Sequence, residues 1–122
     1  MEATDIIDTL TDYVRHRYNN KDSHCVLHKK KFINTFSKSY KTYEYHVWYI
    51  DKTHQEELIA LSHTEKVISD EDKIHAITHI NKQLLSKVFH LLQDNRLDKI
   101  IYGRECNSTN KQISDSCNKG TP

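Results

Sequence analysis

The chain has 122 residues, of which 36 % are hydrophobic and 29 % are charged, and its formal net charge at pH 7 is +1. This length suits one domain with a modest core and excludes two ordinary domains. The low net charge, together with apolar residues that recur at regular spacing, excludes a wholly disordered chain.

The first predicted element is an amphipathic helix over residues 5–18. Apolar side chains recur there at helical spacing, and Thr4 is its expected N-cap. The polar run NNKDS at 19–23 contains turn-forming residues and is expected to end the helix.

Residues 28–40 show a second helical pattern, which separates apolar from basic side chains. The apolar face of this predicted helix contains Phe32, Ile33, Phe36 and Tyr40. The opposite face carries Lys30, Lys31, Asn34 and Lys38, with Lys41 just beyond. The order of a helix, the apolar link CVL, the helix HKKKFINTFSKSY and then strand-rich sequence resembles winged-helix domains. That resemblance implies DNA binding through a helix.

The period changes in YEYHVWYI at 43–50, where aromatic and β-branched residues dominate and alternate with other side chains. This pattern predicts a strand. The segment EELIALS at 56–62 is interpreted as a second strand that pairs back on the first, although its leucines and alanine would also suit a helix.

A long amphipathic helix is predicted over residues 70–94. Ser69 is its expected cap, and three acidic residues follow in the first turn. The apolar positions expected to face the core are Ile74, Ile77, Ile80, Leu84, Leu85, Val88, Leu91 and Leu92. KIIYG at 99–103 is expected to add a short strand.

Together these elements predict a small single α+β domain over residues 4–103, followed by a disordered polar tail over 104–122. In this fold the long helix of the C-terminal half packs on a short antiparallel β-hairpin, and two N-terminal helices complete the core.

Basic residues are concentrated in one part of the chain. Residues 13–41 contain eight lysines or arginines and one acid, which is a charge of +7 in a nearly neutral protein. Such a segment favours contact with phosphates. We therefore expect a small non-enzymatic nucleic-acid-binding or regulatory protein, whose candidate contacts are Arg15, Arg17, Lys30, Lys31, Asn34, Lys38 and Lys41.

Two other interpretations of the basic segment stay open. The lysines can form an ordinary solvated face. Alternatively, the chain can be a protein–protein interaction module, such as a small viral accessory protein, that binds an acidic partner or forms a homodimer. Frequent lysine, asparagine, isoleucine and tyrosine indicate an AT-rich genome, and large DNA viruses are among the sources that fit.

No cofactor and no catalytic residue is expected. Two glycines leave no room for a phosphate-binding loop or a dinucleotide fingerprint. The cluster His24, Cys25 and His28 lacks a second ligand pair at zinc-site spacing, and the pair His75 and His79 lacks a third ligand. No metal site is therefore predicted, although metal binding at either cluster stays open.

The chain shows no signal-peptide pattern and no apolar run long enough to span a membrane. It is therefore expected to be soluble and intracellular, in the cytoplasm or nucleus, with no membrane partner.

Overall fold

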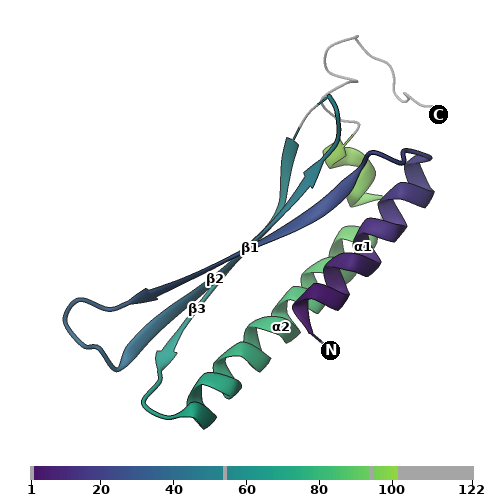
Figure 1. The fold of residues 1–122 in the computed structure, drawn as a ribbon. Coiled ribbons are helices and arrows are strands. Elements are labelled where there is room, and N and C mark those ends of the chain that lie inside the picture. Colours follow the sequence, from purple (N-terminus) through teal and green to yellow (C-terminus); the bar gives the residue numbers. More distant parts are fainter. Residues whose placement is uncertain (1, 54, 94, 102–122) are drawn as a thin grey trace. The chain divides into compact units, whose positions relative to one another are not determined.

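The computed structural model describes residues 2–53, 55–93 and 95–101. The elements are, in order, α1 (Ala3–Tyr18), β1 (His24–Ile33), β2 (Tyr40–Ile50), β3 (Gln55–Lys66) and α2 (Asp70–Leu92) (Figure 1). The class is α+β, with a three-stranded antiparallel sheet in the order β1-β2-β3. The chain divides into two compact units, Met1–Phe89 and His90–Pro122, and the first contains α1, the sheet and most of α2.

The predicted first helix is confirmed as α1, with a different N-cap. The cap is Glu2, in extended conformation, and not Thr4. Asn19 ends the helix in the left-handed conformation at φ 49°, and its N–H donates to the carbonyl of Arg15. Asparagine tolerates this conformation better than most residues, so the polar run at 19–23 does end the helix.

The second helix predicted over residues 28–40 is wrong. This segment belongs to β1, a loop and the start of β2, so only one helix precedes the sheet. β1 pairs with β2 along its whole length, from His24 opposite Ile50 to Ile33 opposite Lys41. Pairing with a neighbouring strand satisfies the backbone groups and overrides the local helical spacing. The resemblance to winged-helix domains fails as well, because its second helix does not exist.

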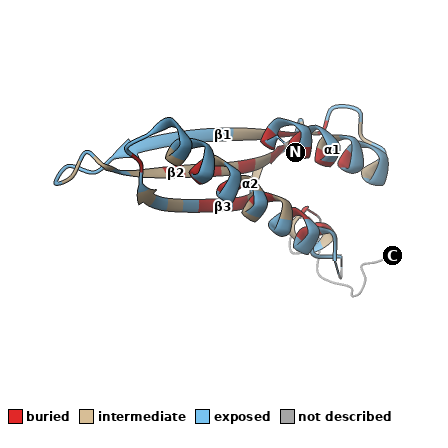
Figure 2. Ribbon diagram, turned by 90° about the horizontal axis from the view of Figure 1, so that it is seen from below, coloured by how far each residue is buried: buried red, intermediate tan, exposed pale blue. Residues whose placement is uncertain are grey.

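Both helices cover the same face of the sheet. Thr11 of α1 accepts a hydrogen bond from the N–H of Cys25, which lies opposite Tyr49 of β2. His79 of α2 stacks on His63, which lies opposite Tyr43. Tyr43 and Tyr49 are six residues apart in one strand, and an even separation places them on the same face. Among the described residues of the first unit, no helix lies on the other face of the sheet (Figure 1). Figure 2 views the sheet from the side that the helices cover.

The core forms between this covered face and the two helices. β2 supplies every second side chain to it, as period-two alternation requires. The buried apolar side chains of the first unit include Ile6, Ile7, Leu10 and Val14 of α1, Tyr43, Tyr45, Val47 and Tyr49 of β2, Ile59 and Leu61 of β3, and Ala76, Ile80 and Leu84 of α2.

The predicted long helix and its cap are confirmed in α2. The Ser69 hydroxyl accepts a hydrogen bond from the N–H of Asp72, and the Asp72 carboxylate accepts one from the N–H of Ser69. This reciprocal arrangement is a capping box. The predicted core face is wrong at its first and last positions. Ile74 is 65 % exposed and Leu92 is 37 % exposed, whereas Ala76, which was not predicted to be in the core, is buried.

The strand predicted over residues 99–103 is also wrong, because residues 96–101 are helical. Residues 102 and 103 and the predicted polar tail over 104–122 lie outside the described residues. Within the described ranges, no helix combines the length and the apolar character that a membrane span requires.

The corrected core assignment can be tested by paired substitutions. Ile80→Ala removes a side chain with no exposed surface, and we expect it to lower the free energy of unfolding by about 2–5 kcal/mol. Phe36→Ala removes a side chain that is 99 % exposed, and we expect a change within about 0.5 kcal/mol. Urea titration measures both. A large loss for Phe36→Ala would restore the helical interpretation, in which Phe36 is a core residue.

Candidate nucleic-acid interface

The distal end of the β1–β2 hairpin concentrates the positive charge of the chain. Residues 28–41, here called the basic hairpin, contain five lysines and no acidic residue. They run from the middle of β1 through the connecting loop to the start of β2 (Figure 1). Every lysine from Lys29 to Lys38 is exposed. Residues 28–41, most of which were predicted to form a helix, therefore belong to a strand, a loop and the start of the next strand.

The loop of the basic hairpin is held by one asparagine side chain. The Asn34 Oδ1 atom accepts hydrogen bonds from the N–H groups of Phe36 (2.8 Å) and Ser37 (3.1 Å). The Asn34 N–H donates to the carbonyl of Tyr40 at 3.0 Å and closes the hairpin. This arrangement fixes the turn and leaves Phe36 exposed at its tip. The sequence predicted that Asn34 contacts nucleic acid. In the structure its side-chain oxygen is instead hydrogen-bonded within the turn.

The lysines are distributed over both faces of the hairpin. Lys30 is on the face without helices, opposite Glu44. Lys29 and Lys31 alternate with it and lie on the covered face, where the Lys29 ammonium is 5.9 Å from the centre of the Tyr45 ring. The predicted single stripe of lysines is therefore wrong, because alternation along a strand sends neighbouring lysines to opposite faces.

The two candidate arginines lie at the other end of the sheet. Arg15 is near the end of α1, and its Nε donates to the carbonyl of Ser23 at 2.8 Å, just before β1 begins. Eight residues separate Ser23 from Lys31 along an extended strand, a distance of about 26 Å at ~3.3 Å per residue. The structure therefore brings Lys30, Lys31, Asn34, Lys38 and Lys41 together, and places Arg15 and Arg17 apart from them.

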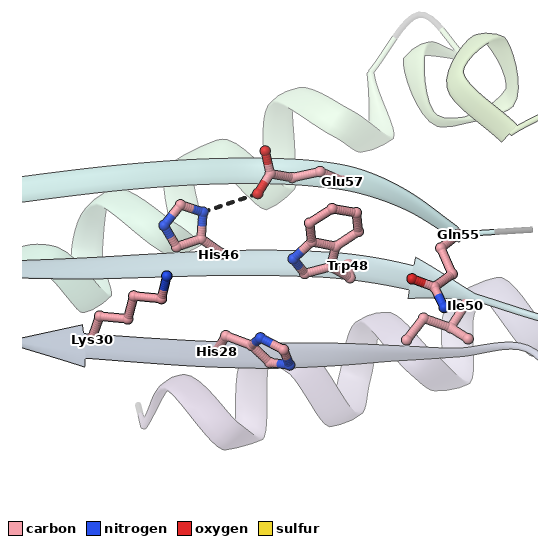
Figure 3. A pocket seen from close by; sticks show the side chains of 7 residues that line it. All are labelled: His28, Lys30, His46, Trp48, Ile50, Gln55 and Glu57. Atoms are coloured by element: carbon pink, nitrogen blue, oxygen red, sulfur yellow. Dashed lines mark hydrogen bonds and ion pairs between the residues drawn. The ribbon is translucent and has the colours of Figure 1, made fainter.

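The sheet face without helices, here called the open face, contains a groove of about 400 Å³. The open face is made by the side chains that alternate with the buried ones along each strand. The groove is lined by His28, Lys30, His46, Trp48, Ile50, Gln55 and Glu57 (Figure 3). All three strands contribute to it, so this site exists only when the sheet is formed.

A histidine between two carboxylates orders one side of the groove. His46 Nδ1 is 2.9 Å from Glu57 Oε2, and His46 Nε2 is 3.1 Å from Glu44 Oε1. Ionised carboxylates only accept hydrogen bonds, so both contacts are complete when the imidazole carries two protons. The hydrogen bonds to Glu44 and to Glu57 therefore raise the pKa of His46 above its usual value of 6.5.

The metal-binding interpretation of His24, Cys25 and His28 has the wrong geometry. Cys25 is buried on the covered face, and both histidines alternate to the open face. Burial raises the pKa of the Cys25 thiol to about 12, which disfavours the thiolate that binds metal.

The second histidine pair belongs to a different arrangement. His75 Nδ1 is 3.1 Å from Glu65 Oε2, and Glu65 Oε1 is 2.6 Å from His63 Nε2. His79 stacks on the His63 ring, with 4.2 Å between their centres. Hydrogen bonds from His63 and His75 lower the pKa of Glu65. Within the described ranges, no group of three or more histidine, cysteine or acidic side chains has an arrangement that suits a metal ion.

Sequence reasoning missed the groove, although one signal for it was present. The strict alternation in YEYHVWYI separates Tyr43, Tyr45, Val47 and Tyr49 from Glu44, His46 and Trp48. Burial of the first set predicts exposure of the second. The positions of Glu57 and Gln55 were not predictable, because a register shift between β2 and β3 at Val47 and Trp48 changes which residues face each other.

Comparison with known proteins gives no match for this chain among protein-family models, curated proteins or solved structures.

The protonation of His46 can be measured by following its ring protons by NMR as the pH changes. We expect a pKa above 6.5, and Glu44→Gln with Glu57→Gln should lower it toward 6.5. Because the folded pKa is raised, this group stabilises the fold fully below pH 6.5, and the contribution is lost as pH rises through the folded value. An unchanged pKa in the double variant would contradict the assigned contacts. His24, for which neither carboxylate is a partner, serves as the control histidine.

Proposed function

We propose that this protein binds nucleic acid through the basic hairpin, residues 28–41, without catalysing a reaction. The observation that carries this proposal is the grouping of five lysines and no acidic residue within residues 28–41, whose loop presents a fully exposed phenylalanine. Glu44 of β2 lies opposite Lys30, and its carboxylate is hydrogen-bonded to His46. The exposed lysines can neutralise phosphates on both sides of the ribbon.

The shape of the segment supports the same ligand. A two-stranded β-ribbon fits a nucleic-acid groove, and lysines on both of its faces reach phosphates on either side. Exposed apolar side chains at the end of such a ribbon can contact sugars or bases. The four exposed apolar residues here are Phe32, Ile33, Phe36 and Tyr40.

Protection of the sheet edge is a competing explanation for part of this charge. β1 is an edge strand, and lysines on an edge oppose pairing with another chain. That explanation accounts for Lys29, Lys30 and Lys31. It does not account for Lys38 in the loop, or for an apolar tip that would itself favour association.

A second candidate function is a protein–protein interaction module, including a homodimer. The exposed apolar tip favours it, because residues such as Phe36 and Ile33 are typical of interface cores. The lysines of β1 oppose a dimer formed by pairing of two β1 edges. Light scattering separates the alternatives, since self-association through the tip raises the molar mass with concentration and Phe36→Ser abolishes that rise.

The nucleic-acid proposal predicts that charge reversal in the basic hairpin abolishes binding. Lys30→Glu, Lys31→Glu and Lys38→Glu together remove three phosphate contacts and add three repulsive charges. We expect loss of detectable binding to single-stranded and duplex oligonucleotides at low salt, measured by fluorescence anisotropy. For the unaltered protein, each lysine that contacts a phosphate should add about 0.7–0.9 to the slope of log K against log salt.

The matched control reverses three exposed lysines on α2, Lys73, Lys82 and Lys87. It changes the net charge equally and should keep most of the affinity. Equal losses in both triple variants would mean that only the total charge matters. Absence of binding by the unaltered protein at low salt would overturn the proposed function.

A further inference from the structure

We propose that the open face binds an unpaired segment of nucleic acid, with one base stacked on the Trp48 indole in the groove. This inference rests on the proposed function, and it names an unpaired segment of nucleic acid as the ligand of the open face. It concerns residues outside the basic hairpin as well as within it.

Aromatic rings occur at intervals along the open face. Phe32 and Tyr40 lie at the loop end of the sheet, on diagonal positions of β1 and β2. His28 and His46 face each other further along, and Trp48 follows. From Tyr40 to Trp48 the strand rises about 26 Å, which equals the rise of roughly eight stacked nucleotides at ~3.4 Å each.

The groove has the features of a site for one base. Trp48 provides a flat apolar surface beside Ile50, and Gln55 offers an amide with both donors and an acceptor (Figure 3). A volume of about 400 Å³ is at the lower end of the range for small-ligand pockets. Stacking tolerates any base, since every base has a π-face, and the amide can pair with a base edge.

Charge along the face also suits a single strand. Lys30 extends from β1 across the same face as His46 and Trp48 (Figure 3). The carboxylate of Glu57 in the groove is held by His46 at 2.9 Å, which offsets part of its repulsion toward phosphate. Glu44, opposite Lys30, is likewise hydrogen-bonded to His46, at 3.1 Å. Of the lysines of the basic hairpin, Lys30 lies on the open face and Lys38 lies in the loop beyond its end.

An unpaired strand fits this face better than a duplex does. The rings of a duplex are stacked on one another, so their π-faces do not reach a flat sheet surface. Unpaired bases can turn onto exposed aromatic side chains while their phosphates follow the lysines. The Trp48 ring can therefore stack on a base only if that base is not stacked between its neighbours in a duplex.

The single tryptophan of the chain makes the test direct, because all indole fluorescence comes from the groove. Three probes of equal length are titrated at low salt: a single-stranded ten-nucleotide thymidine oligomer, a ten-base-pair duplex, and an abasic ten-unit strand with the same phosphates. We expect the thymidine oligomer to quench Trp48 strongly. The abasic strand should bind through the lysines and leave the fluorescence nearly unchanged, as should the duplex.

Variants separate stacking from folding, which circular dichroism monitors in each. Trp48→Ala should weaken binding of the thymidine oligomer roughly 5- to 150-fold by anisotropy, and change binding of the abasic strand little. Trp48→Phe retains an aromatic ring and should restore most of the affinity. If Trp48→Ala does not fold, quenching in the unaltered protein and the Trp48→Phe affinity still decide the question.

The inference about the open face and the proposed function are contradicted by different results. If all three probes bind, the basic hairpin variants abolish binding, and Trp48 is not quenched, the inference about the open face is wrong and the proposed function stands. If no probe binds, both are wrong. A fluorescence change that depends on protein concentration alone would assign the open face to a second copy of the chain and overturn the inference.

Discussion

The alternation of side chains along β2 is the constraint on which the rest of this structure depends. Tyr43, Tyr45, Val47 and Tyr49 face the two helices and form the centre of the core. The strand is paired on both sides, so its register determines that of β1 and β3. A slip of one residue would move all four side chains to solvent and bring the charged Glu44 and His46 into the core. Register is therefore strongly specified here.

The same constraint links the core to the proposed binding surface. With one face of the sheet buried under α1 and α2, the alternate residues of β2 are left on the open face, and Trp48 is one of them. β1 then places Lys30 beside them and sends Lys29 and Lys31 to the other face. The loop held by Asn34 leaves Phe36 exposed. The register of β2 therefore determines both which side chains form the open face and how the lysines are distributed on the basic hairpin.

The parts of the fold that were predictable have a strong local pattern. α1, β2 and α2 show clear periodicity, and Ser69 caps α2 as its position indicated. The segment at 28–40 was wrongly predicted as a helix, because Phe32, Ile33 and Phe36 have the spacing of one apolar helix face. In the structure these three side chains are exposed on a hairpin. Local spacing cannot show which residues a strand partner will cover. The candidate lysines were identified by composition, but their separation from Arg15 and Arg17 depends on long-range pairing.

The most direct test of this account is an NMR map of the backbone amides and the Trp48 indole during titration with a single-stranded oligonucleotide. We expect the resonances of residues 28–41 and of the Trp48 indole N–H to shift progressively with saturation. The amides around Lys73, Lys82 and Lys87 on α2 should stay in place. Shifts confined to the helices, or absent from residues 28–41 at saturation, would contradict the claim that this hairpin is the binding element.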